Sequence, residues 1–385
     1  MSKPSLSNML LIFILSSGLV AVMFSDFVLA SEAMGDSWNT MAPMNQARGR
    51  LGAIAVDGKL YAIGGSLASF ASRNETEYMA TNECYDPTAN TWVTLAPMPT
   101  PRYGFAIATY DGKIYCIGGY GYNESSLVGN SELGVNEVYD VVANSWNIKA
   151  ALPVSGGSLQ AQVVAGKIFV IDQLNGTLFM YDPASDIWVA KTELPSWGRG
   201  LVSAVVDDKI IVTGKFYFLI DQRLTNERKI LIYDIKTDRW NEGTLGPEVD
   251  AHTSAAGATS GLYVPQKVYV FYGGLVTATL VYDPVTDGWS DGRAMPVDRF
   301  SFDVAVIDDV FYVLGGFPAL GGEPLAVNEQ YVPADYQGTL PSESFLDDSG
   351  FVGVLVGMVM AVVVVISLIF FFKNKKGKNQ TAQEV

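Results

Sequence analysis

The chain has 385 residues, of which 49% are hydrophobic and 17% charged, and its net charge at neutral pH is −15. This composition excludes a chain that is disordered over most of its length, because disordered segments are poor in hydrophobic residues. The negative charge excludes the basic surface that nucleic-acid binding requires. One histidine, His252, and two cysteines, Cys84 and Cys116, are too few for a histidine-rich metal site or a disulfide framework. We therefore expect neither a metal nor a cofactor.

The first 30 residues have the pattern of a signal peptide. Lys3 is the only charge before an apolar run from Met9 to Phe24, and Val28-Leu29-Ala30 fits a cleavage site. The run is shorter than the roughly 20 residues that cross a bilayer. The sequence therefore predicts export with removal of residues 1–30, and an uncleaved signal anchor is the alternative.

Five segments further along the chain share one sequence motif. Each has a Tyr-Asp pair with a Trp seven residues after the Tyr, and the tryptophans of the repeat, counted from Trp38, are 42 to 54 residues apart. The five pairs are Tyr85/Trp92, Tyr139/Trp146, Tyr181/Trp188, Tyr233/Trp240 and Tyr282/Trp289. Glycine doublets follow three of the tryptophans by 26 residues, at Gly64-Gly65, Gly118-Gly119 and Gly315-Gly316. Repetition at such a period indicates a structure built from equal units.

Each unit has the pattern of four short strands. Segments such as Lys59–Ile63 are rich in β-branched and aromatic residues, and Asp57-Gly58 before this segment is a hairpin turn. The Tyr-Asp pair ends the third strand, and its aspartate is expected to form a turn before the Trp opens the fourth strand. These repeated aspartates belong to different units, so they do not predict a catalytic acid/base set.

The glycine doublet, the Tyr-Asp pair and the Trp seven residues later resemble the kelch repeat. The resemblance covers residues 36–335 and implies an all-β fold, a six-bladed kelch-type β-propeller. Trp38 has no Tyr-Asp pair before it, and Tyr331 has no Trp after it, so each supplies what the other lacks. We expect residues 37–41 to form the outer strand of a sixth blade whose other strands come from residues 300–332.

The alternating direction of the strands assigns the loops to two rims. Connections after second and fourth strands lie on one rim, here called rim one, and connections after first and third strands lie on the opposite rim, rim two. The chain leaves the propeller after a third strand, near Tyr331, and so at rim two. Rim one carries the long loops, and binding residues are common on loops held by a rigid scaffold. The predicted binding aromatics there, which in the alternative interpretation only cover the blades, are Tyr120, Tyr122, Phe216 and Phe218.

Arginines recur on the same rim, nine residues before an aspartate at the start of a second strand. They are Arg48, Arg102, Arg199 and Arg299. One interpretation is a ring of donors for a carboxylate or an acidic partner. The other is a structural role, in which the arginines donate hydrogen bonds to backbone carbonyls of neighbouring blades.

Three further features bear on chemistry. Gln160, Ser203 and Asp303 occupy matching places on innermost strands, where they are expected to line a central channel. Cys84 and Cys116 are expected to be buried thiols, and a disulfide between adjacent blades is the alternative. Asparagines that fit the N-glycosylation pattern lie in connections between second and third strands, at Asn74, Asn123 and Asn175.

The C-terminal region predicts a membrane anchor. Residues 351–372 carry no charge over 22 residues, enough to cross ~30 Å of hydrocarbon. The lysines that follow mark the cytoplasmic side, so residues 373–385 are a cytoplasmic tail and residues 336–350 a short stalk. The propeller is then outside the cell membrane.

The preferred function is a binding module that docks a protein or glycan on rim one. The alternative follows from a resemblance to exported kelch-type sialic-acid mutarotases, which are sugar-modifying enzymes. Asp303 and the four arginines would then be the residues most concerned with activity. The sequence identifies no catalytic set by itself, so the binding module is preferred to an enzyme.

Overall fold

The computed structural model describes residues 35–69, 75–126, 129–220, 223–247, 253–274 and 276–340. The predicted signal peptide, transmembrane helix and cytoplasmic tail lie outside these residues, as do His252 and residues 341–350 of the predicted stalk. Within the described residues, no helix has the length and apolar character needed to cross a membrane. A single turn of 3-10 helix, Glu75–Glu77, is the helical element of this part of the chain.

Six four-stranded antiparallel sheets make up most of the described chain. Sheet 1 consists of β2 (Gly52–Val56), β3 (Lys59–Ile63), β4 (Asn82–Asp86) and β5 (Thr91–Thr94). Sheet 2 consists of β7 (Ala106–Tyr110), β8 (Lys113–Ile117), β11 (Asn136–Asp140) and β12 (Ser145–Lys149). Sheet 3 consists of β13 (Leu159–Val164), β14 (Lys167–Asp172), β15 (Thr177–Asp182) and β16 (Ile187–Ala190). Sheet 4 consists of β17 (Gly198–Val206), β18 (Lys209–Ile220), β19 (Arg223–Asp234) and β20 (Arg239–Leu245). Sheet 5 consists of β21 (Thr253–Ala258), β22 (Val268–Gly273), β23 (Ala278–Asp283) and β24 (Gly288–Gly292). Sheet 6 consists of β26 (Asp303–Ile307), β27 (Val310–Leu314), β29 (Asn328–Val332) and β1 (Ser37–Thr40).

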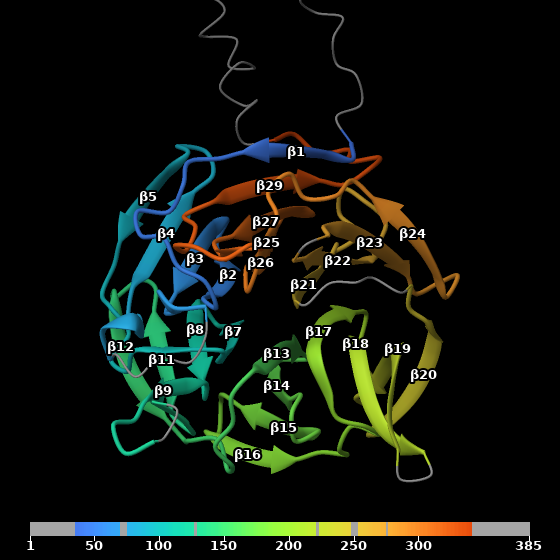
Figure 1. Cartoon of the computed structure of the whole chain (residues 1–385), viewed down its shortest axis with the longest axis horizontal. Helices are drawn as coiled ribbons and strands as arrows, with labels where there is room; N and C mark the ends of the chain where they lie inside the picture. The colour runs from blue at the N-terminus through green and yellow to red at the C-terminus, as the bar shows by residue number, and fades with distance from the viewer. Residues whose placement is uncertain are drawn as a thin grey trace, which may run out of the picture.

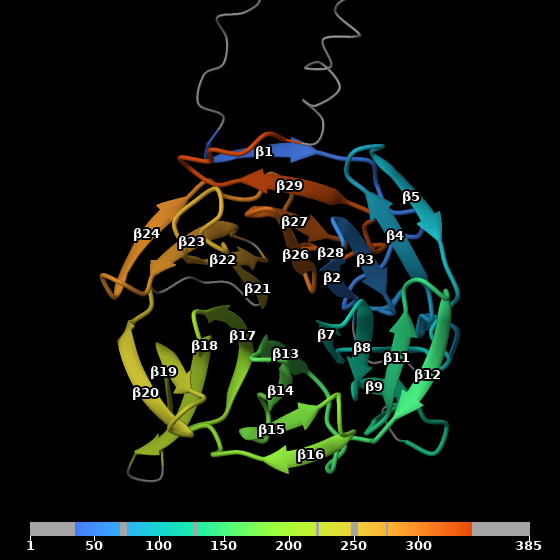
Figure 2. The same cartoon turned by 180° about the vertical axis from the view of Figure 1, so that it is seen from behind.

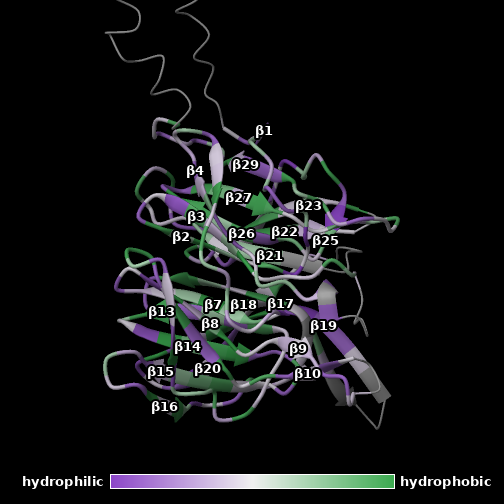
Figure 3. Ribbon diagram, turned by 90° about the vertical axis from the view of Figure 1, so that its left-hand side faces the viewer, coloured by the Kyte–Doolittle hydropathy of each residue, from purple (hydrophilic) through white to green (hydrophobic). Residues whose placement is uncertain are grey.

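The sheets are arranged around a central axis, with the first strand of each nearest the axis (Figure 1). Each innermost strand contacts the innermost strand of the next sheet, and β26 of sheet 6 contacts β2 of sheet 1. The hydrophobic core is divided accordingly into six clusters, one between each pair of neighbouring sheets. Seen from the side, β27, all of whose residues are buried, stands out as hydrophobic (Figure 3).

The predicted closure by the N-terminal strand is confirmed. β1 pairs antiparallel with β29, and Trp38 lies opposite Tyr331 in the register, with ring centroids 5.0 Å apart. From both sides of the ring, β1 is the outermost strand beside β29 (Figures 1 and 2). Asp36 reinforces the join, because its Oδ1 accepts hydrogen bonds from the Tyr331 hydroxyl at 2.8 Å and from the Arg293 amide at 2.6 Å.

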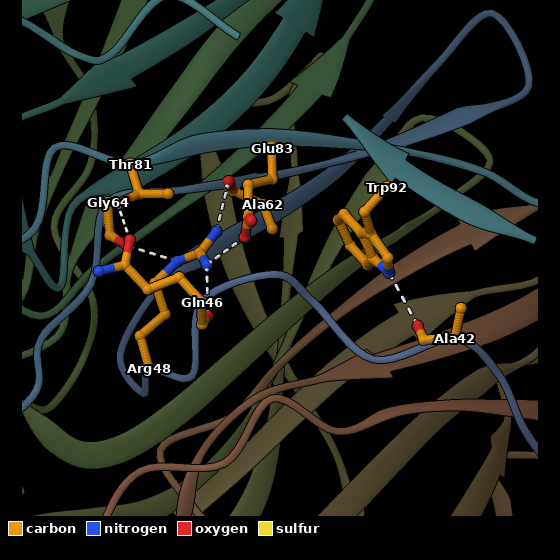
Figure 4. A network of polar contacts seen from close by, with 8 residues as sticks. All are labelled: Ala42, Gln46, Arg48, Ala62, Gly64, Thr81, Glu83 and Trp92. Atoms are coloured by element: carbon orange, nitrogen blue, oxygen red, sulfur yellow. Dashed lines mark hydrogen bonds and ion pairs between the residues drawn. The ribbon is translucent and has the colours of Figure 1, made fainter. Parts of the chain in front are cut away.

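The repeated Tyr-Asp…Trp spelling ties each sheet to the one before it. In sheet 1 the Tyr85 hydroxyl donates to Asn90 Oδ1 at 2.7 Å, and the same oxygen accepts the Ala42 amide at 2.8 Å. The Trp92 indole donates to the Ala42 carbonyl at 2.8 Å, as Figure 4 shows. Asp86 accepts the amides of the turn that follows it, so the expectation that these aspartates form turns is correct. We call this arrangement the Tyr–Trp staple.

Rim one carries two smaller sheets above the main ones. One consists of β6 (Arg102–Tyr103), β9 (Tyr120–Tyr122) and β10 (Asn130–Glu132), and the other of β25 (Arg299–Phe300) and β28 (Phe317–Pro318). Rim two carries the end of the described chain. There the Gln337 amide donates to the Tyr263 carbonyl, the rings of Tyr263 and Tyr336 lie 5.6 Å apart, and Leu340 is buried.

Candidate functional site

The structure corrects the predicted ring of ligand-binding arginines. Arg48, Arg102 and Arg299 are fully buried, and each forms an ion pair with a glutamate of the third strand in its sheet. The glutamates are Glu83, Glu137 and Glu329. Burial lowers the pKa of the Arg48 and Arg299 guanidinium groups, and the paired glutamates act in the opposite direction.

The hydrogen bonds of Arg48 show what these side chains do. Its guanidinium donates to the carbonyls of Gly64 at 3.0 Å, Ala62 at 2.8 Å and Gln46 at 2.8 Å, in addition to the pair with Glu83 (Figure 4). These bonds hold the loop of rim one against β3. A guanidinium used in this way is unavailable to a ligand, so these three arginines have a structural role. The carbonyls that they reach belong to their own sheet, at Ala62, Cys116 and Val313, and not to a neighbouring sheet as expected.

Arg199 does not share their place in the repeat. The first residue of the hairpin turn has a positive φ in each repeat concerned, at Asp57, Asp111, Asp207 and Asp308. The three buried arginines precede this residue by nine positions, whereas Arg199 precedes it by eight. The position of the glutamate in that repeat is taken by Leu231, which is buried. The side chain of Arg199 lies outside the described part of the chain, so its binding role stays a prediction.

The aromatic residues of rim one divide into two groups. Tyr120 and Tyr122 join Tyr78 and Tyr103 in a cluster, with centroid distances of 5.4 Å for Tyr103–Tyr120 and 6.0 Å for Tyr78–Tyr122. Phe216 is fully buried in the cluster between sheets 3 and 4, because β18 continues as a paired strand where the sequence indicated a loop. The prediction that Phe216 contacts a ligand is therefore wrong.

One exposed aromatic pair escaped the sequence analysis. Trp197 is 38% exposed and stacks on Tyr217 with centroids 4.8 Å apart and an interplanar angle of 12°. Tyr217 lies next to Phe218, whose side chain is outside the described part and whose binding role stays a prediction. The stacked pair places aromatic surface at rim one above sheet 4.

Two cavities that share lining residues lie on the axis. A channel of about 320 Å³ runs along the innermost strands, and the predicted residues Gln160, Ser203 and Asp303 line it. A second cavity of about 550 Å³ opens at the rim-one end, and we call it the cup. The cup is lined by Arg50, Tyr103, Tyr120, Gln160 and Asp303, among others. Since Gln160 and Asp303 line both cavities, they form the floor of the cup.

Asp303 is the carboxyl group of this floor. Its Oδ2 accepts the Ala53 amide at 2.8 Å, across the junction between sheets 6 and 1. Burial raises the pKa of Asp303 to about 7, and hydrogen bonds from the Ala53 and Val304 amides act in the opposite direction. A carboxyl group that titrates near neutrality is suited to proton transfer or to binding a cation.

The lip of the cup is a ring of residues with left-handed backbone. It comprises Arg50, Gly104, Ser158, Gly200 and Ser301, with φ values of 56°, 64°, 54°, 61° and 56°. Two neighbouring pairs of the ring are bonded through the backbone: the Arg50 amide donates to the Ser301 carbonyl at 2.7 Å, and the Gly104 amide donates to the Arg50 carbonyl at 3.4 Å. Sequence analysis missed Arg50. The signal was its place two residues after a recurring arginine, where the two other repeats with a buried arginine have Gly104 and Ser301.

The remaining predicted sites concern modification and thiol chemistry. Asn74 lies outside the described residues. Asn123 and Asn175 lie in connections between second and third strands, and their glycosylation stays a prediction. Cys84 and Cys116 are free and buried, and burial raises the pKa of Cys116 to about 12. Among the described residues, no group of three or more His, Cys, Asp and Glu side chains is placed to hold a metal ion.

Comparisons with known proteins agree with the repeat spelling. The Kelch motif family matches residues 47–99 and 101–153, the stretches that contain sheets 1 and 2. Kelch-like protein 35 of Mus musculus is 30% identical over 148 residues, which are 37% of this chain and 23% of the relative. Kelch repeat and BTB domain-containing protein 13 of Homo sapiens is 29% identical over 137 residues, which are 35% of this chain and 27% of the relative. The matched part is thus about a quarter of each relative's length.

A solved structure shares the fold. The structure of YjhT superimposes with a TM-score of 0.58 at 16% sequence identity, covering 75% of this chain and 96% of the other. At this identity the likeness concerns the fold alone. The repeated sequence motif, the matched Kelch motifs and the ring of four-stranded sheets agree. The chain carries Kelch motifs over residues 47–99 and 101–153, and its fold is all-β and propeller-like.

Proposed function

We propose that this protein is a membrane-anchored, extracytoplasmic interaction module that binds a protein or glycan partner on rim one. The six sheets act as the six blades of a closed propeller, and residues 351–372 hold it in the membrane. The observation that carries the proposal is the aromatic surface of rim one, formed by the tyrosine cluster and by the stacked Trp197–Tyr217 pair. The same rim also holds the cup of about 550 Å³. Concave sites with aromatic walls and a few polar groups are typical of binding sites.

The packing of the last described residues supports the orientation of the module. Residues 333–340 lie on rim two, where Tyr336 and Gln337 contact Tyr263. Ten residues then remain before residue 351, and ten residues span at most ~35 Å. A tether that starts from rim two and is this short directs rim one away from the membrane.

The relatives support an interaction role but do not identify a partner for this chain. One of them, the Influenza virus NS1A-binding protein of Homo sapiens, is named for binding a protein, and it is 43% identical over 79 residues. Those residues are only 11% of that relative. Its partner is therefore not transferred to this chain.

The proposal is tested with the full chain in proteoliposomes, probed with a glycan array and an array of purified secreted and cell-surface proteins. The test variant is Tyr122→Ala with Trp197→Ala, and the control is Val285→Ala, whose side chain is 90% exposed on rim two. We expect at least one ligand whose affinity falls tenfold or more in the test variant, with an unchanged melting temperature. Absence of any ligand, or loss in the rim-two control alone, would contradict the proposal.

A second function, a sugar-modifying enzyme, has one specific observation in its favour. Asp303 lies between cup and channel, and its pKa of about 7 suits a general acid or base at neutral pH. The full chain would be incubated with reducing sugars and sialic acids while anomer exchange is followed by NMR. Acceleration that is lost in Asp303→Asn would favour the enzyme, and rates equal to the buffer would count against it.

A further inference from the structure

Two side chains of opposite charge border the cup, and neither has a counter-ion there. Arg50 lies at the lip and Asp303 at the floor. Within the described residues, no carboxylate oxygen lies within 4.0 Å of the Arg50 guanidinium, and no cationic nitrogen lies that close to Asp303. A partly buried charge without a partner is unfavourable, so each group favours a ligand atom of opposite charge.

Arg50 is not required for the architecture of the lip. Its backbone has a φ of 56°, a conformation that costs energy for a residue with a side chain. Glycine fills the matching positions of two other repeats, at Gly104 and Gly200, and the Gly104 amide bonds to the Arg50 carbonyl as the Arg50 amide bonds to the Ser301 carbonyl. The fold does not explain an arginine at such a position. Its place at the edge of the cavity suggests that it binds a ligand there.

The Arg50 side chain is held at the edge of the cup. Its guanidinium lies over the Tyr103 ring, 4.8 Å from the centroid, and donates to the Ser69 carbonyl. Burial lowers the pKa of Arg50, and Tyr103 acts in the opposite direction. A planar guanidinium has five donors, so it retains donors for a carboxylate in this arrangement.

The separation of the two charges limits the ligand to a short molecule. The Asp303 carboxylate accepts the Ala53 amide, and Arg50 precedes Ala53 by three residues, which span at most ~10 Å of backbone to which the arginine side chain adds its own length. The rest of the lining is uncharged and includes hydrogen-bonding side chains such as Gln160 and Ser301. These groups suit the hydroxyl or amide parts of a small polar ligand.

We propose that the cup binds a small zwitterion, a molecule with a carboxylate at one end and a protonated amine at the other, such as an ω-amino acid or a short peptide. The carboxylate binds Arg50 at the lip, and the ammonium group binds Asp303 at the floor. The site is independent of the proposed function, because a macromolecule on the outer loops and a small ligand in the cup can each be present without the other. Tyr122 and Trp197, which test the former, do not line the cup.

The test is titration calorimetry on the full chain in mild detergent. The probes are ω-amino acids from glycine to 8-aminooctanoate, diglycine and triglycine, with hexanoate and hexylamine as singly charged controls. We expect affinity to peak at one length, and each singly charged probe to bind at least tenfold more weakly than the best zwitterion. The proposal is wrong if no zwitterion binds with a Kd below ~10 mM, or if a singly charged probe binds as tightly.

Two variants identify the charges. Arg50→Gly reproduces the residue found at Gly104 and Gly200, and Asp303→Asn removes the charge at constant size. Each should lower the affinity for the best zwitterion at least tenfold, with a melting temperature no lower than that of the wild-type chain. Arg239→Gly, an exposed outer-strand control, should leave the affinity unchanged. Loss in only one of the two cup variants would also overturn the proposal, since it would identify a site for an acid or an amine alone.

Discussion

The two halves of the ring hold the same architecture by different means. Sheets 6, 1 and 2 each bury an arginine–glutamate pair, whereas the glutamate positions of sheets 3, 4 and 5 hold Phe179, Leu231 and Leu280. Glycine doublets at the end of the second strand accompany all three pairs, at Gly64-Gly65, Gly118-Gly119 and Gly315-Gly316, and the other half has one such doublet, Gly273-Gly274 in sheet 5. In sheet 1, the Gly65 amide donates to the Arg102 carbonyl of sheet 2 at 3.0 Å, and a Cβ on Gly64 would lie 2.7 Å from that oxygen.

The comparison separates interactions that every sheet contains from interactions that only some sheets contain. The Tyr–Trp staple recurs in all six sheets, although the indole nitrogen of Trp289 has no partner. The arginine–glutamate pair occurs in three, and both members are absent together elsewhere. A buried ion pair and an apolar replacement of similar volume often have similar net stability, because desolvation offsets the attraction between the charges.

Removing one member of a pair should have the largest effect. Glu83→Ala leaves the Arg48 guanidinium buried without its counter-charge, so we expect a loss of about 3–5 kcal/mol in the free energy of unfolding. Arg48→Met with Glu83→Leu, which imitates the other half, should recover most of that loss. Urea unfolding of the single and double variants measures both values. A loss below ~1 kcal/mol in the single variant would contradict the idea that these pairs act as units.

The next effect concerns the junction of sheets 6 and 1, which carries Asp303. Its pKa is raised from 3.8 to about 7 by burial, so the folded state holds the proton more tightly than the unfolded state. The stability that the protonated Asp303 carboxyl contributes is fully present below pH ~4 and is lost as pH rises through 7. Between pH ~4 and ~7, Asp303 should therefore reduce the free energy of unfolding by about 1.4 kcal/mol per pH unit, and above pH 7 the cost should stay constant.

Asp303→Asn removes this dependence, and thermal unfolding from pH 5 to 8 measures it. The variant should gain stability relative to the wild-type chain as pH rises. Gln160→Glu places a carboxyl at the same floor on the other half of the ring and serves as the matched comparison. Parallel stability curves for the wild-type chain and Asp303→Asn would show that Asp303 titrates at its ordinary pKa.

The staple should matter equally in both halves. Tyr85→Phe and Tyr233→Phe each remove one hydroxyl, which donates to Asn90 in one half and to Asp238 in the other. Each should lower the free energy of unfolding by about 1 kcal/mol, the usual contribution of one hydrogen bond. Chemical denaturation of the two variants side by side gives the comparison. A loss confined to one half would restrict the staple's role to that half.

Exposed ion pairs should have the smallest effect. Lys59 and Asp86 lie 3.1 Å apart in sheet 1, where the lysine side chain is 49% exposed. Solvent screens such a pair, so Lys59→Ala should change stability by less than ~1 kcal/mol, against the several kcal/mol expected at Glu83. The midpoint of urea unfolding checks this. A change as large as that of Glu83→Ala would mean that burial is not what distinguishes the pairs.

The sequence predicted those parts of the molecule that depend on local spacing. The complementary positions of Trp38 and Tyr331 were enough to predict the join of β1 to β29, because pairing within an outer blade follows the repeat. The turns after the Tyr-Asp pairs were predictable for the same reason. Residues of the channel followed from counting positions on innermost strands.

The fate of a side chain was harder to predict when it depended on residues from another strand. Arg48 is buried because Glu83 lies 35 residues away on a strand beside it. The sequence did contain the signal, since a glutamate stands two residues before the tyrosine in the same three repeats that have the arginine. Phe216 was misplaced because β18 continues past its glycine as a paired strand. Arg50 stood out only once the backbone showed that it shares a position with Gly104 and Gly200.

The borrowed strand β1 also determines when the protein becomes complete during synthesis. Asp36 and Tyr331, which hydrogen-bond in the finished molecule, are 295 residues apart in the chain. The segment made first must therefore wait, with its backbone edge unpaired, until the last repeat has been made. Closing so long a loop is slow, and an open strand edge promotes aggregation. A nascent chain truncated before Tyr331 should accordingly be a substrate for chaperones and proteases.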